Sequence, residues 1–198
     1  DKWRKPHDVA FSTWCLFIFT ELLVHDFLDA FNNYGTGWFE PFNDARISFH
    51  ILFVVDPLFT IVPVVCFAWL LFRRTHRKRN FWSVITIGWC FFYLAVSLVN
   101  KMVVDSDVRK VASRKNINYF RHFTTPTPFN NMLWFVVLQS DKGYYVGHRS
   151  VFDTRYDMPL YYFPRNDSLL LPVKDLPDLT DLMRFSQGYY TIENWGDT

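Results

Sequence analysis

The sequence predicts an α-helical membrane region of about three transmembrane helices, followed by a small α+β soluble domain that is mainly antiparallel sheet. Half of the 198 residues are hydrophobic, yet the mean hydropathy is close to zero. Apolar and polar residues must therefore be segregated along the chain. Residues 9–104 are mostly apolar, whereas residues 105–198 read as a water-soluble sequence rich in aromatic residues. We expect a membrane domain over residues 1–104 and an extracytoplasmic β-rich domain over residues 105–198.

Apolar runs in the first half are the candidates for membrane helices. Residues 81–99 carry no charge and are long enough to cross a hydrocarbon layer of about 30 Å. Residues 51–72 form a run of similar length, although Asp56-Pro57 and Pro63 interrupt it; membrane helices tolerate proline when neighbours satisfy the freed carbonyls. Residues 9–24 form a shorter run that crosses the membrane with residues 25–31 as its last turns, or packs against other helices.

Lys and Arg residues predict the orientation of these helices. A basic cluster lies between the second and third runs, at Arg73, Arg74, Arg77, Lys78 and Arg79, and a smaller one precedes the first run, at Lys2, Arg4 and Lys5. The positive-inside rule places residues 73–80 and the start of the chain in the cytoplasm, and residues 105–198 on the other side. A basic cluster beside apolar runs, with a net charge of only +2, argues against nucleic-acid binding.

The second half predicts short strands and a helix. Aromatic and β-branched segments separated by Pro, Asn, Asp and Gly are typical of strands, and they occupy residues 117–123, 131–139, 143–152 and 160–164. Asp141-Lys142-Gly143 predicts a hairpin turn between the second and third of these segments. We expect a short helix over residues 176–186 and a last strand over residues 188–194.

The most distinctive polar side chains follow the first apolar run. His25 and Asp29 are four positions apart, so they share one face of a helix. An imidazole and a carboxylate can provide two ligands to a divalent ion, and the other ligands must come from elsewhere. Asp56 is the next candidate, because an ionisable group within an apolar run is costly and is usually functional.

A structural interpretation of the same residues stays open. His25 can lie at the water interface, and Asp29 can bond to the turn that follows it. Asp56 can cap a helix that begins at Pro57, since Asp is a favoured N-cap and Pro a favoured first residue. The sequence contains no G-x-S-x-G, Walker or H-E-x-x-H motif.

An ordered series of motifs connects these residues. His25 and Asp29 are followed by Tyr34-Gly35-Thr36, Pro41-Phe42, Arg46 and Asp56-Pro57, and later by the segment PTPFNN at residues 126–131. In this series the sequence resembles the YdjM-type inner-membrane metal-dependent hydrolases, also labelled LexA-binding. The resemblance implies a multi-pass protein of the bacterial inner membrane, with its outer domain in the periplasm. It also implies a divalent metal ion, zinc or similar, with His25 and Asp29 among its ligands.

The sequence departs from this family at its start. Family members usually begin with another membrane segment that carries Pro-Asp-x-Asp and His-Arg-x-x-(Thr/Ser)-His motifs, and neither motif occurs here. The chain also begins at Asp1 without a Met. We therefore expect it to be part of a longer polypeptide, whose N-terminal segment completes the site.

The function implied by the resemblance is hydrolysis at the outer membrane–water boundary. The metal would lower the pKa of a bound water, with His25 and Asp29 as ligands, Asp56 as ligand or general base, and Arg46 as a clamp for an anionic substrate. This location suits a phosphoester or lipid-linked substrate, with membrane lipid as a partner. The alternative is a non-catalytic membrane subunit whose outer domain binds a protein partner, either another membrane subunit or the missing N-terminal segment. A transporter is disfavoured, since no inverted repeat is present.

Overall fold

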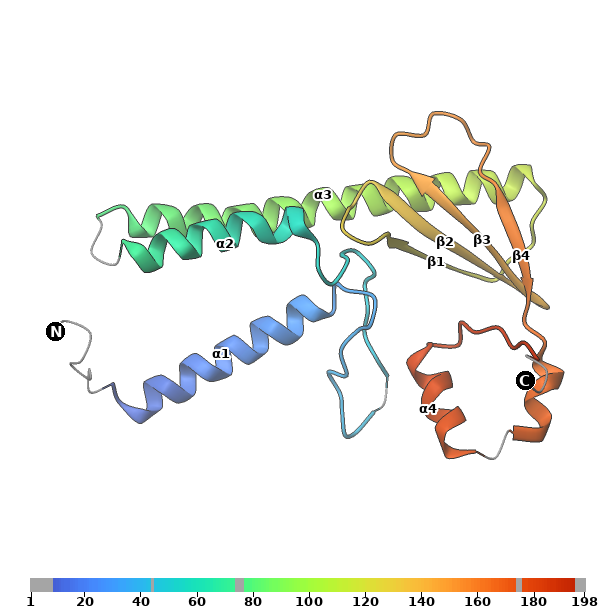
Figure 1. Ribbon diagram of the computed structural model, residues 1–198, viewed down its shortest axis with the longest axis horizontal. Helices are drawn as coiled ribbons and strands as arrows, with labels where there is room; N and C mark the ends of the chain where they lie inside the picture. Colours follow the sequence, from blue (N-terminus) through green and yellow to red (C-terminus); the bar gives the residue numbers. More distant parts are fainter. Residues whose placement is uncertain (1–8, 44, 74–76, 174–175, 195–198) are drawn as a thin grey trace. The chain divides into compact units, whose positions relative to one another are not determined.

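The computed structural model describes residues 9–43, 45–73, 77–173 and 176–194 (Figure 1). The chain divides into two compact units, Asp1–Phe49 and His50–Thr198. The first unit contains helix α1 (Phe11–Asp29) and the loop that follows it. The second unit contains the other helices and the sheet, and the two units are described separately below.

Helix α1 is apolar along most of its length, and its charged and imidazole side chains, Glu21, His25, Asp26 and Asp29, lie in its second half. It has 19 residues, and none of its side chains is buried. A helix with this composition that buries nothing in its own unit is suited to contact lipid. In the part of the chain that the structure describes, α1 and α3 (Arg79–Arg114) are the two helices long and apolar enough to cross a membrane.

Helix α2 (Pro57–Phe72) is shorter than the sequence predicts. The expected run began at residue 51, but the helix starts at Pro57 because Asp56 occupies its N-cap position. Its 16 residues span about 24 Å, which is less than a typical hydrocarbon layer. A third membrane-crossing helix is therefore not confirmed. Arg74 of the basic cluster that follows lies outside the described residues, as do Lys2, Arg4 and Lys5 at the start of the chain.

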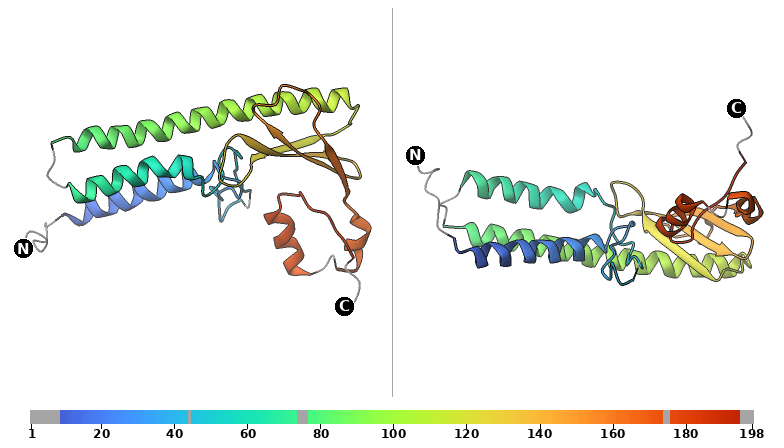
Figure 2. Two further views of the ribbon diagram at one scale, coloured as in Figure 1. Left: turned by 45° about the horizontal axis from the view of Figure 1, so that its top comes forward. Right: turned by 90° about the horizontal axis from the view of Figure 1, so that it is seen from below.

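Helix α3 contacts both α2 and the sheet of the second unit. Its 36 residues span about 54 Å, so it continues well beyond the apolar run at residues 81–99. Its first half lies alongside α2 (Figure 2), with the Trp69 and Trp82 rings 5.0 Å apart. Its second half lies against the sheet. The domain boundary predicted at residues 104–105 falls inside this helix and stays a prediction.

The sheet has four antiparallel strands in the order β1-β2-β3-β4. They are β1 (Arg121–Pro126), β2 (Leu133–Ser140), β3 (Gly143–Ser150) and β4 (Leu160–Pro164). Ser140 pairs with Gly143, which confirms the hairpin turn predicted there. Helices followed by an antiparallel sheet are thus confirmed. Two further helical segments follow, η1 (Asp167–Val173) and α4 (Pro177–Phe185), and α4 confirms the predicted short helix.

The strand predicted over residues 188–194 does not form. This segment contacts the sheet through side chains instead of pairing along an edge. The Tyr144 hydroxyl donates to the Gly188 carbonyl at 3.0 Å and accepts from the Tyr190 N–H at 3.4 Å. The Tyr189 ring lies 5.4 Å from the Phe123 ring. The aromatic residues that suggested a strand therefore pack onto a face of the sheet.

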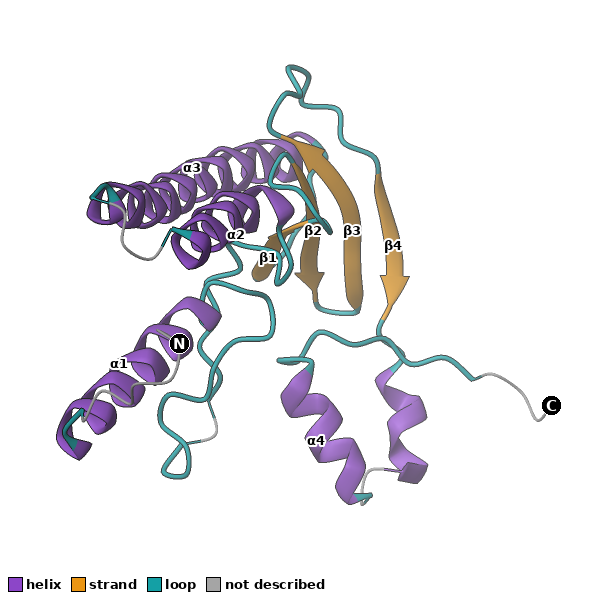
Figure 3. Ribbon diagram, turned by 60° about the vertical axis from the view of Figure 1, so that its left-hand side comes forward, coloured by secondary structure: helices purple, strands orange, loops and turns teal. Residues whose placement is uncertain are grey.

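One face of the sheet and α3 share a hydrophobic core (Figure 3). Alternate residues of β2 point toward α3 and are buried there, together with one side of the helix: Trp134, Val136, Leu138, Val104, Val108 and Val111. The intervening residues Phe135 and Val137 point to the opposite face, as strand geometry requires.

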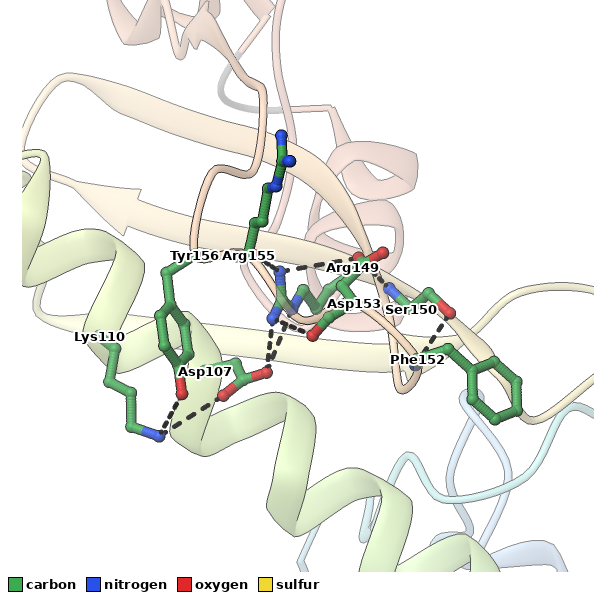
Figure 4. A network of polar contacts seen from close by, with 8 residues as sticks. All are labelled: Asp107, Lys110, Arg149, Ser150, Phe152, Asp153, Arg155 and Tyr156. Carbon is green, nitrogen blue, oxygen red and sulfur yellow. Dashed lines mark hydrogen bonds and ion pairs between the residues drawn. The ribbon is translucent and has the colours of Figure 1, made fainter.

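A buried polar network fastens β3 to α3 (Figure 4). The Arg149 side chain is 1% exposed and forms an ion pair with Asp107 at 2.7 Å. Its guanidinium also donates to the carbonyl oxygens of Asp153 and Arg155, at 2.9 and 2.5 Å. The network therefore connects α3, β3 and the loop after β3, and it fixes the position of the sheet along the helix.

Candidate metal centre

His25 and Asp29 lie together in the last turn of α1. Their Nε2 and Oδ2 atoms are 3.5 Å apart, and the side chains are 71% and 46% exposed. Two ligands of a tetrahedral zinc ion, each bonded at about 2.0–2.2 Å, are separated by roughly 3.4 Å. The pair therefore fits two positions around one divalent ion. The same distance also permits a direct ion pair when His25 is protonated.

The turn after α1 positions the Asp29 carboxylate. The Asn32 amide donates to Asp29 Oδ1 at 3.4 Å. The Asn32 side-chain oxygen in turn accepts from the backbone N–H groups of Tyr34 and Gly35, at 2.8 and 3.2 Å. The local bond that the structural interpretation expected for Asp29 is thus present. It uses Oδ1, whereas Oδ2 is the oxygen nearest His25, so both interactions can exist at once.

Arg46 holds the same turn from the other side. Its Nε donates to the Tyr34 carbonyl at 3.0 Å, and its Nη2 donates to the Gly35 carbonyl at 2.7 Å. Thr36 and Ile47 pair through two backbone hydrogen bonds of 2.9 Å. Gly35 has a φ of 68°, a conformation that glycine adopts without strain. Arg46 and the Tyr-Gly-Thr motif therefore form one substructure, and the anion-binding role of Arg46 stays a prediction.

Asp56 lies in the second unit and is 2% exposed. Its Oδ1 accepts from the backbone N–H groups of Leu58 and Phe59, at 2.9 and 3.3 Å. Its Oδ2 accepts from the Tyr93 hydroxyl at 2.7 Å. The expected capping role is confirmed, and these bonds account for a carboxylate in an apolar run. A role as metal ligand or general base stays a prediction.

Among the described residues, no group of three or more His, Cys, Asp or Glu side chains is arranged to hold a metal ion. A metal ion bound by His25 and Asp29 would therefore need further donors from outside this pair. Water molecules, substrate groups and further chain segments are all chemically suitable.

A second buried polar cluster was not predicted. Asn131 donates from its side-chain amide to Ser97 Oγ, and its backbone carbonyl accepts from the Asn100 side-chain amide at 2.9 Å. Ser97 Oγ donates to the Tyr93 carbonyl at 2.8 Å, which connects the cluster to the partner of Asp56. The one indication of this cluster in the sequence was the PTPFNN motif, which contains Asn131. This cluster joins the loop before β2 to α3 at the end of its apolar run.

Comparison with known proteins identifies the family of the chain. The YdjM inner membrane protein family matches residues 2–104, a region that contains α1, α2, the first part of α3 and the motif residues from His25 to Pro57, whereas the PTPFNN segment at residues 126–131 lies outside it. Neither a curated protein nor a solved structure shows significant similarity to the chain. The family match extends over slightly more than half of the 198 residues, and with two apolar helices it indicates membrane association. The chain therefore belongs to the YdjM inner membrane protein family.

Proposed function

We propose that the chain is part of a membrane-embedded, metal-dependent hydrolase in which His25 and Asp29 hold a divalent ion, zinc or similar. The observation that supports this function best is the 3.5 Å separation of His25 Nε2 and Asp29 Oδ2. A bound ion would lower the pKa of a water molecule and polarise the scissile group. The motif turn beside the pair supports the same proposal, because ligands need partners that orient them.

Each candidate site residue has a defined task in this proposal. Asn32 holds one oxygen of Asp29 and leaves the other available as a ligand. Asp56 would act as a further ligand or as general base, with its second oxygen oriented by the Tyr93 hydroxyl. Arg46 would attract an anionic substrate group, since its guanidinium has donors beyond the two that bond the turn.

The proposed topology is multi-pass. Helices α1 and α3 would cross the inner membrane, and α2 would cross together with the irregular residues before it. The basic segment at residues 73–80 would then be cytoplasmic and residues 105–198 periplasmic. In this arrangement His25 and Asp29 lie at the outer membrane–water boundary. A phosphoester or lipid-linked substrate would reach them there.

Zinc titration tests the proposal. Isothermal titration of the purified full chain should show saturable binding that His25→Ala and Asp29→Ala each abolish. Asp26→Ala is the matched control, because Asp26 is also an exposed carboxylate in the last turns of α1, and this variant should bind as the wild type does. Equal binding in all four proteins would overturn the assignment of the ligands.

A non-catalytic subunit is the second candidate, and the C-terminal segment favours it. Leu182 and Phe185 of α4 are 63% and 60% exposed, although a water-soluble surface rarely gathers large apolar side chains. Under this alternative, a protein partner would copurify in fixed ratio, and Leu182→Glu would release it. The wild-type protein would then contain no metal.

A further inference from the structure

A cavity of about 550 Å³ lies on the face of the sheet that points away from α3. Phe123, Phe135, Val137 and Phe163 are among the sheet residues that line it, and Tyr189 lines it from the C-terminal segment. Small-molecule sites usually enclose about 300–1,000 Å³ and are mostly apolar. The cavity therefore has the size and lining of a site for an apolar group.

One end of this cavity is cationic. Arg121 and Phe123 are two positions apart on β1, so they share a face of the sheet. The Arg121 guanidinium lies 4.7 Å from the centre of the Tyr189 ring, and its Nη1 donates to the Gln187 carbonyl at 3.2 Å. Neither contact neutralises its charge. An anionic group beside the cavity would therefore find an arginine already held in place.

The electrostatics of the β1 edge agree with this geometry. The His50 ring meets the Phe123 ring edge-on, with centroids 4.5 Å apart. Burial, together with the charges of Lys101 and Arg121, lowers the pKa of His50 to about 4. His50 is thus neutral near pH 7, so the charge beside the cavity is that of Arg121. Lys101 bonds to Thr124 and interacts with Asp105.

The cavity also has a direction relative to α3. Asn131, just before β2, contacts α3 at Ser97, within the apolar run. The Leu133 end of β2 is therefore nearest the membrane. Arg121 pairs with Gln139 at the opposite end of the same two strands. Leu133 is 40% exposed and extends the apolar face of Phe135 toward the membrane end.

We propose that this cavity binds the acyl chain of an anionic membrane lipid, with the headgroup at Arg121 and the chain directed past Phe135 toward Leu133. This direction is that of a lipid in the adjacent leaflet, with its headgroup away from the bilayer centre. The proposal rests on the membrane insertion of α3 proposed above, but it does not depend on a metal at His25 and Asp29. It gives the sheet a function of its own, the recognition of a lipid by both charge and chain.

Photocrosslinking tests this proposal. The full chain is reconstituted in phosphatidylcholine vesicles that contain phosphatidylglycerol with a diazirine in its acyl chain, and crosslinked peptides are identified by mass spectrometry. We expect labelling of residues 133–137 and 144–146, reduced about tenfold by Arg121→Gln through loss of one charge-assisted contact. Arg155→Gln, at an exposed arginine of the same sheet domain, should label as the wild type does. Phosphatidylcholine with the same diazirine should label the cavity weakly.

A second variant distinguishes filling of the cavity from loss of the Arg121 charge. Val146→Trp places a bulky side chain in the cavity and should remove its labelling with either lipid, while residues 81–99 remain labelled in every protein. Cavity labelling that neither Arg121→Gln nor Val146→Trp reduces would overturn the proposal. Loss of labelling at residues 81–99 as well would instead show that the proposed membrane insertion is wrong.

Discussion

Arg149 donates from both Nε and Nη2 to the same oxygen of Asp107, at 3.2 and 2.7 Å, although the two residues are 42 positions apart in the sequence. Both side chains are nearly inaccessible to water. A buried charge that loses its partner keeps the cost of leaving water, whereas an intact pair offsets that cost. The pair thus makes the attachment of β3 to α3 depend on both residues.

We expect Asp107→Ala to destabilise the sheet and α3 by about 3–5 kcal/mol, because the Arg149 guanidinium would remain buried without a carboxylate. Thermal unfolding of the purified protein in detergent, followed by near-UV circular dichroism, measures the change. Asp157→Ala is the control, since Asp157 is 89% exposed and its ion pair with Lys115 lies on the surface. Equal melting temperatures for the two variants would show that the buried pair contributes nothing.

Gly35→Ala should loosen the turn that supports Asp29. Gly35 has a φ of 68°, and an added Cβ would lie 2.8 Å from the Ile47 carbonyl oxygen. A left-handed conformation costs a residue with a side chain about 1–2 kcal/mol, and the contact adds to this cost. We expect faster proteolysis within residues 30–49. Gly88→Ala is the control, because a Cβ there meets no atom of the described residues within 4 Å beyond its own helix turn. Equally fast cleavage of residues 30–49 in the Gly88→Ala protein would show that the strain at Gly35 is not the cause.

His50 should make the second unit sensitive to mild acid. Its pKa is lowered from 6.5 to about 4 by burial and by the charges of Lys101 and Arg121. The unfolded state therefore binds a proton near pH 6.5 that the folded state does not yet bind, so stability falls as the pH decreases from about 6.5 to about 4. His50→Asn removes this titration and suits the positive φ of 51°. Melting temperatures at pH 7 and pH 5 should differ more for the wild type than for His50→Asn; an equal decrease in both would contradict the assignment.

Asp56→Asn and Asp56→Ala should have different effects on stability. Asn is an equally good N-cap, whereas Ala at this position costs about 1 kcal/mol and leaves the Tyr93 hydroxyl without its acceptor. Asp56→Asn should thus melt close to the wild type and Asp56→Ala clearly lower. If Asp56 also binds metal, Asp56→Asn weakens zinc affinity, and Tyr93→Phe weakens it to a smaller extent through loss of the bond that orients Asp56. Unchanged zinc affinity in Asp56→Asn would restrict Asp56 to its capping role.

Local patterns predicted the parts of the structure that depend on neighbours in sequence. The Asp141-Lys142-Gly143 turn, the alternation along β2 and the proximity of His25 and Asp29 all follow from spacings of a few residues. The start of α2 at Pro57 was one of the two interpretations of Asp56, the one in which Asp56 caps the helix. Residues 188–194 were predicted wrongly, because their aromatic side chains pack onto a sheet face whose position depends on distant contacts.

The missed features share one property. Arg149 with Asp107, and Asn131 with Ser97, are pairs separated by 42 and 34 positions. Their meeting depends on the register of the sheet along α3, and residue types alone do not determine that register. The cavity beside Arg121 was missed for the same reason, since it combines β1 with a segment almost seventy residues later.

The most direct test of the proposed function is the metal content of the native-length gene product, with any segment that completes the site, purified from membranes without added metal. Elemental analysis of the wild type should find about one divalent ion per chain. His25→Ala and Asp29→Ala should each lose it, and Asp26→Ala should retain it. A wild type that contains no metal, or a metal content that none of these substitutions changes, would contradict the assignment of His25 and Asp29 as ligands.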